Sequence, residues 1–66
     1  MVIQINGEVK EVPSGTTIEK LIELYRLNKK SVVCELNHKV VDRYIYSETR
    51  LQENDTLEIV QFVGGG

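Results

Sequence analysis

The 66-residue sequence predicts an α+β domain in which a mixed sheet of four to five strands packs on one helix. Two observations lead to this fold class. Short segments near both ends have the pattern of strands, with alternating apolar and polar residues in the first hairpin and a mostly apolar run near the C-terminal end, whereas one segment between them repeats its apolar residues at helical spacing. A chain of this length forms one domain and buries only about 60% of its unfolded surface, so we expect a small core.

Residues 2–12 are predicted to form a β-hairpin. Ile3 and Ile5 lie on one face of its first strand, and Val9 stands among charged residues in its second. The intervening Asn6-Gly7 is the pair that best tolerates the positive φ angles of a tight turn.

One helix is predicted to follow and to end near Leu27-Asn28. Thr16 and Glu19 have the spacing of a capping box, in which each side chain bonds the other residue's backbone amide. Lys29-Lys30 are expected near the negative end of the helix dipole. The apolar face is expected to consist of residues three or four positions apart, namely Ile18, Leu21, Ile22 and Tyr25.

A second strand pair is predicted over residues 32–36 and 39–41, joined by a turn at Asn37-His38. Cys34 falls on the apolar face of the first of these strands. We interpret it as a small core residue, because a reactive thiol needs an exposed, electropositive setting that this stretch does not offer.

Residues 42–51 have no regular period, and Tyr44 and Tyr46 are expected to pack there. Glu53-Asn54-Asp55 is predicted to be a turn in which Asn54 takes a left-handed conformation.

The last strand, residues 56–63, is the most apolar. Leu57 and Ile59 lie on one face and Val60 and Phe62 on the other. A strand that is apolar on both faces is typical of a central position in a sheet.

The order of elements is hairpin, helix, strand pair, strand. A right-handed crossover can therefore place the last strand beside the first and bury the helix on one sheet face, which is a β-grasp arrangement. We expect a β-grasp domain at residues 1–63 and a flexible glycine tail at residues 64–66.

The charge pattern excludes some partners. The net charge is −2 and the only adjacent basic pair is Lys29-Lys30, so we expect no binding to nucleic acid or to a membrane. The N-terminus has neither the basic flank nor the apolar run of a signal peptide or membrane span. The single cysteine fits a reducing, cytoplasmic location.

Conventional catalytic and binding patterns are missing from the sequence. With one His and one Cys, it supports neither a metal site nor a nucleophile pair, and no glycine-rich loop ends in the Gly-Lys-Ser/Thr of a phosphate-binding loop. We therefore expect no bound cofactor and no enzyme activity of the chain itself.

The remaining candidate is the glycine tail, Gly64-Gly65-Gly66. Glycines have no β-carbon, so such a peptide can thread a channel too narrow for side chains, and the Gly66 carboxylate is unhindered for attack on the α-phosphate of ATP. A frayed terminus or a cloning scar is the alternative explanation of the same three residues.

The whole sequence resembles the sulfur carriers of thiamine biosynthesis, the ThiS-type proteins, which are ubiquitin-like. The final Phe62-Val63-Gly64-Gly65-Gly66, directly after an apolar strand, is the most specific match. The other matching segments are Ile5-Asn6-Gly7-Glu8, Pro13-Ser14-Gly15-Thr16-Thr17-Ile18, Val33-Cys34-Glu35-Leu36-Asn37 and Leu57-Glu58-Ile59-Val60. Asn37-His38 departs from the Asn-Gly usual in the family.

This resemblance implies a β-grasp fold and a set of partners. A ubiquitin-activating-like (ThiF-type) enzyme would use ATP to adenylate Gly66, while Gly64 and Gly65 thread its active site. Sulfur from a cysteine-derived donor would then form a thiocarboxylate, and a ThiG-type thiazole synthase would take that sulfur into the thiazole ring.

Other functions remain open. The same carrier chemistry serves molybdopterin synthesis and tRNA thiolation, a ubiquitin-like modifier would join Gly66 to lysines, and a plain interaction domain would not need its glycines. Val60 and Phe62 are a further hypothesis, because an apolar pair on the face away from the helix could dock a partner. The alternative is that Phe62 packs on the core or on Val2.

Overall fold

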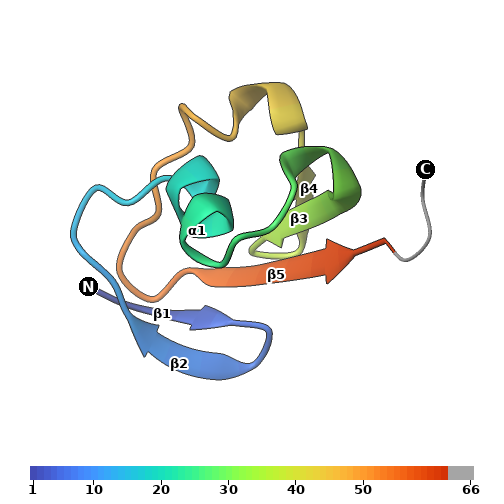
Figure 1. The fold of residues 1–66 in the computed structure, drawn as a ribbon. Helices are drawn as coiled ribbons and strands as arrows, with labels where there is room; N and C mark the ends of the chain where they lie inside the picture. Colours follow the sequence, from blue (N-terminus) through green and yellow to red (C-terminus); the bar gives the residue numbers. More distant parts are fainter. Residues whose placement is uncertain (63–66) are drawn as a thin grey trace.

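The computed structural model describes residues 1–62. Its elements in chain order are β1 (Val2–Ile5), β2 (Glu8–Glu11), α1 (Ile18–Leu24), η1 (Lys29–Ser31), β3 (Val32–Leu36), β4 (Lys39–Val41), η2 (Arg43–Ile45) and β5 (Thr56–Gln61). The strands form one five-stranded sheet in the order β2-β1-β5-β3-β4, and α1 lies over one of its faces (Figure 1). The predicted α+β fold with one helix on a mixed sheet is confirmed.

The last strand joins the two halves of the sheet. β5 pairs in parallel with β1, with Ile5 opposite Leu57, and antiparallel with β3 along its length, with Val32 opposite Gln61. This central position, which the apolar character of the strand predicted, gives β5 a neighbour on each side.

The core lies between α1 and the sheet face that the helix covers. Alternate residues of the three inner strands point into it, as the period of two predicts. Its buried members are Ile3, Ile5, Val12, Ile18, Leu21, Ile22, Val32, Cys34, Tyr46, Leu51, Leu57 and Ile59. The predicted core position of Cys34 is therefore confirmed.

The predicted capping box at Thr16 is wrong. The helix begins one residue later, and Thr17 is its N-cap, with the Thr17 hydroxyl accepting a hydrogen bond from the Lys20 amide at 3.1 Å. Thr16 is buried, its hydroxyl donates to the Pro13 carbonyl, and its own carbonyl accepts from the Leu51 amide at 2.8 Å. This contact with a distant segment holds Thr16 outside the helix.

The helix also ends earlier than predicted, at Leu24. Arg26 takes a left-handed conformation (φ 57°), and the Leu27 amide bonds back to the Ile22 carbonyl at 2.9 Å. This is a Schellman ending, which glycine usually marks and which an arginine conceals in the sequence. Tyr25 consequently lies beyond the helix and is exposed, and Lys29 belongs to η1, where its amine pairs with Glu19 at 3.1 Å.

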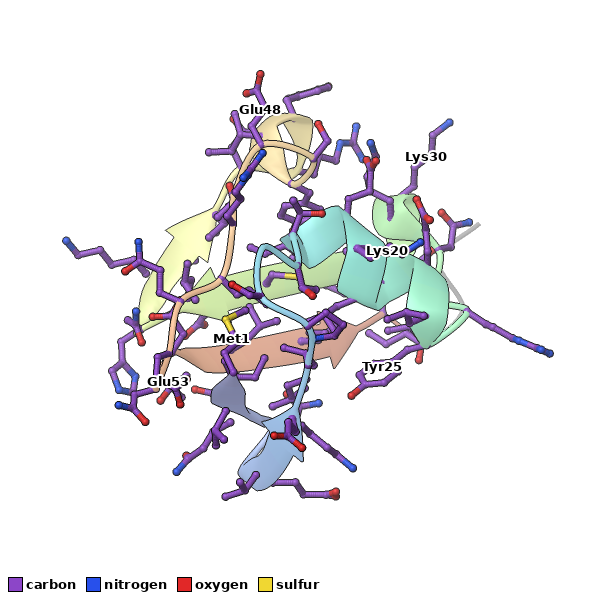
Figure 2. All side chains as sticks on the ribbon, turned by 90° about the vertical axis from the view of Figure 1, so that its left-hand side faces the viewer. Met1, Lys20, Tyr25, Lys30, Glu48 and Glu53 are labelled. Carbon is purple, nitrogen blue, oxygen red and sulfur yellow. The ribbon has the colours of Figure 1, made fainter. Side chains whose placement is uncertain are left out.

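The two tyrosines of the irregular segment have opposite environments. Tyr46 is among the largest fully buried side chains, as predicted, but Tyr44 is 77% exposed and lies against Arg43. The prediction that Tyr44 packs in the core is wrong, because η2 turns that side chain outward. Figure 2 shows the same outward direction for Glu48, on the turn after η2, and for Lys30 on η1.

Three turns rely on asparagines with positive φ. Asn6, Asn37 and Asn54 have φ angles of 50°, 52° and 71°, and His38 shares the turn of Asn37. These are the turns the sequence predicted. Within residues 1–62, no helix has the length and hydropathy needed to cross a membrane.

Candidate functional site: the strand that leads to the chain end

β5 is held along its edge with β3. Five residue pairs join the two strands, and beyond the last of them the Phe62 amide donates to the Ser31 carbonyl at 2.8 Å. The pairing with β3 and the bond from Phe62 therefore fix the direction of the backbone as far as Phe62. Val63, with which the predicted last strand and β-grasp domain end, and the predicted tail residues Gly64, Gly65 and Gly66 lie outside the described residues.

The two faces of β5 differ in exposure. Leu57 and Ile59 are buried under the helix, whereas Val60 and Phe62, on the opposite face, are each 53% exposed. Val33 stands directly opposite Val60 on the neighbouring strand and is half-buried. These three residues, Val33, Val60 and Phe62, form an apolar strip on the open sheet face beside the point where the chain leaves the sheet.

Phe62 packs neither in the core nor on Val2. Its exposure excludes it from the buried cluster, and Val2 lies at the other end of β5, where its carbonyl accepts from the Asn54 amide at 2.7 Å. The alternative explanation of Phe62 is thus wrong, and its ring is available to another molecule.

Two carboxylates border the apolar strip. Glu35 and Glu58 stand directly opposite each other on β3 and β5, on the same open face. Like charges in this position destabilise a sheet, because their carboxylates repel across the strands. A partner with basic groups next to an apolar surface would relieve this repulsion.

Cys34 is unsuited to sulfur chemistry. It has no exposed surface, and burial raises the pKa of its thiol. A hydrogen bond with Tyr46 lowers the pKa, but this effect is smaller than that of burial. The thiolate, which is the reactive form, is therefore disfavoured. In the described part of the chain, no three His, Cys, Asp or Glu side chains come together to hold a metal ion.

Tyr46 connects β3 to the start of the helix. Its hydroxyl accepts a hydrogen bond from the Cys34 amide at 3.2 Å, and its carbonyl accepts from the Glu19 amide at 3.1 Å. Burial raises the pKa of Tyr46 to about 12, from an ordinary value near 10. The folded state thus favours the neutral phenol.

This shift predicts a loss of stability at alkaline pH. The contribution of neutral Tyr46 is complete below pH 10 and disappears as the pH rises through about 12, which amounts to about 2–3 kcal/mol of unfolding free energy. Tyr46→Phe should remove this part of the pH dependence, while lowering stability at neutral pH by about 1–3 kcal/mol because the Cys34 amide loses its acceptor.

Urea unfolding between pH 8 and pH 12 measures both effects. Tyr44→Phe, at an exposed tyrosine, is the matched control and should follow the parent protein at every pH. Equal alkaline losses in the Tyr46→Phe variant and the parent protein would contradict the assignment to Tyr46.

Comparison with known proteins decides the family. The ThiS family model matches residues 3–66. The chain belongs to the ThiS family. It is 40% identical to the sulfur carrier protein ThiS of Bacillus subtilis over 65 residues, which cover 97% of this chain and 98% of that protein. The predicted resemblance to the sulfur carriers of thiamine biosynthesis is confirmed.

A solved structure supports the same fold. The crystal structure of the thiamine biosynthesis protein ThiS from Geobacter metallireducens superposes with a TM-score of 0.83 at 26% identity, over all of both chains. A thiazole synthase of Magnetococcus marinus is 41% identical over 66 residues, which are the whole of this chain but only 20% of that enzyme. Some thiazole synthases thus contain a ThiS-like segment, and this chain spans about a fifth of the length of these enzymes.

Sequence reasoning identified the strand and its two faces, but it missed Asn6. The Asn6 side chain bonds the backbone of Ile59, 53 residues away in the sequence. The only signal was the Asn-Gly turn, which explains the choice of asparagine by backbone conformation alone.

Proposed function

We propose that this ThiS-family chain carries sulfur on the carboxylate of Gly66 and supplies it for formation of the thiazole ring of thiamine. The observation that carries the proposal is the match with the ThiS family model, which runs to residue 66 and so includes the segment after Phe62, together with the match to the B. subtilis sulfur carrier over 97% of this chain. The strand leading to that segment is anchored and borders an exposed apolar strip, as delivery of a chain end to a partner requires.

The chemistry proceeds in two steps at one carboxylate. A Gly66 oxygen attacks the α-phosphate of ATP, pyrophosphate leaves, and an acyl-adenylate forms. A persulfide of the cysteine-derived donor then attacks the carbonyl carbon and AMP leaves, which gives an acyl disulfide. A thiol reductant cleaves its S–S bond, so that the thiocarboxylate stays on Gly66 and the reductant is oxidised to a disulfide. The chain provides the acyl group, and the partner enzymes provide catalysis and hold the ATP.

The proposed partners are a ThiF-type adenylating enzyme and a ThiG-type thiazole synthase. The thiazole synthase is supported by relatives such as the M. marinus enzyme, in which a ThiS-like segment belongs to the enzyme's own chain. The thiol of Cys34 is buried and its pKa is raised by that burial, which supports Gly66 rather than the cysteine as the sulfur-bearing residue. A cytoplasmic location and the absence of any bound cofactor stay predictions.

Intact mass spectrometry tests the function. The chain is incubated with ATP, a ThiF-type enzyme, a cysteine desulfurase, cysteine and a thiol reductant, and we expect a mass gain equal to exchange of one oxygen for sulfur. Omission of ATP should prevent the gain. A conjugate with lysines of other proteins would instead indicate a covalent modifier, and no change with enzymes that thiolate another carrier would contradict the proposal.

The apolar strip is proposed to dock the adenylating enzyme. Phe62→Ala should raise the apparent KM for the carrier by about tenfold, because exposed aromatics at the centre of an interface contribute most of its affinity. The melting temperature should change little, since Phe62 is outside the core. Tyr44→Ala, at an exposed aromatic of η2, is the control, and an equal KM in the two variants would refute docking through Phe62.

A further inference from the structure

β5 pairs with β1 over a shorter stretch than with β3. β1 ends at Ile5, so the backbone pairing of the two strands covers only Gln4 with Thr56 and Ile5 with Leu57. On the other edge, β3 accompanies β5 as far as Gln61. Residues 58–61, the part of β5 that leads to the chain end, therefore lack a backbone neighbour on the β1 side.

One side chain continues the ladder where the backbone of β1 stops. The Asn6 amide donates to the Leu57 carbonyl at 3.0 Å. The Asn6 side chain then occupies both ladder positions of the next residue on that edge: Oδ1 accepts from the Ile59 amide at 2.8 Å, and Nδ2 donates to the Ile59 carbonyl at 3.3 Å. A primary amide has the same donor and acceptor as a peptide group, so it can replace one.

Asn6 is held in place for this task by its turn. Its positive φ of 50° belongs to the tight hairpin between β1 and β2. The residue is exposed, but both of its side-chain bonds to Ile59 are partly buried. The hairpin tip is thus attached to the last strand three residues before Phe62. On the opposite edge, β3 pairs with Val60 and Gln61, and the Phe62 amide donates to the Ser31 carbonyl just beyond them.

We propose that Asn6 is a positioning residue for the chain end: by clamping Ile59, it fixes the direction in which β5 carries the chain to the partner's active site. This inference rests on the proposed function, in which the Gly66 carboxylate must reach a reacting phosphate. Small displacements of a reacting group reduce rates strongly, so a strand end that frays delivers its carboxylate less often in a productive geometry. Asn6 itself touches no reacting atom.

The chain offers a matched control in Asn37. It also lies in a hairpin turn with positive φ, and its side chain also makes two bonds, accepting from the Thr56 amide at the start of β5 at 2.9 Å and donating to the carboxylate of the preceding Asp55 at 3.0 Å. Asn37 therefore binds the beginning of β5, at the end of the strand away from Phe62. Glycine tolerates positive φ, so Asn6→Gly and Asn37→Gly each remove the side-chain bonds and keep the turn.

Two measurements are compared for the parent protein and both variants, well below their melting temperatures. Hydrogen exchange of the Phe62 amide should become roughly tenfold faster in Asn6→Gly, because the strand end opens more often when two hydrogen bonds are lost, and should stay near the parent value in Asn37→Gly. The rate of thiocarboxylate formation at saturating carrier should fall by a similar factor in Asn6→Gly only.

The outcomes separate this inference from the proposed function. If the parent protein gains sulfur and the two variants react at equal rates, or if their Phe62 amides exchange equally, Asn6 is only a turn residue and the inference is overturned. If the parent protein gains no sulfur, the proposed function fails, and the exchange rates alone decide whether Asn6 holds the strand end.

Discussion

Deletion of Gly66 is expected to abolish thiocarboxylate formation while leaving the fold intact. The truncated chain still ends in a glycine carboxylate, but that carboxylate belongs to Gly65. One extended residue spans about 3.3–3.6 Å, so the acyl carbon stops short of the adenylation site by that distance. Misplacement by about 1 Å can already reduce a rate about a hundredfold, so we expect no detectable product.

Intact mass before and after incubation with the adenylating system measures the loss, and thermal unfolding checks the fold. Addition of one glycine after Gly66 is the matched variant, because it moves the carboxylate by the same distance in the other direction, and it should fail as well. Glu48→Gln, at an exposed turn residue, should react like the parent protein. Normal thiolation of the truncated chain would show that Gly66 is not the residue that carries sulfur.

Leu57→Ala is expected to unfold most of the population. Leu57 has no exposed surface and lies near the start of β5, where Ile5 stands opposite it on one neighbouring strand and Leu36 on the other. Truncation of a buried leucine costs about 2–5 kcal/mol, which includes the cavity left behind. A core of this size rarely supplies more than about 3–5 kcal/mol in total, so the loss consumes most of the stability.

Leu24→Ala makes the same chemical change at an exposed position. Leu24 is the last residue of α1 and is 56% exposed, so its truncation should alter the unfolding free energy by less than about 0.5 kcal/mol. Urea unfolding followed by circular dichroism compares the two variants. Similar unfolding midpoints for Leu57→Ala and the parent protein would contradict the central role of Leu57.

Much of the fold could be predicted from local patterns. The period of two along β5 separated Leu57 and Ile59 from Val60 and Phe62, and the structure places these pairs on opposite faces. Asparagines marked the turns because few other residues tolerate positive φ. These features depend on residues near one another in the sequence, so the sequence alone determines them.

Other features depend on segments that meet only after folding. Thr16 and Thr17 are equally good caps by residue type, and the bond from the distant Leu51 amide selects Thr17 by holding Thr16 outside the helix. Tyr44 and Tyr46 are two positions apart in the sequence, yet the direction of η2 buries Tyr46 and exposes Tyr44.

The candidate site divides in the same way. The sequence by itself determined the family and the apolar character of both faces of β5, and it predicted a role for the three glycines after Val63. Only the tertiary structure decided that the Val60 face stays open, because one helix covers one side of the sheet, and that the Asn6 amide completes the β5 ladder at Ile59. Side-chain bonds between residues so far apart follow from the packing of whole elements, which no local pattern encodes.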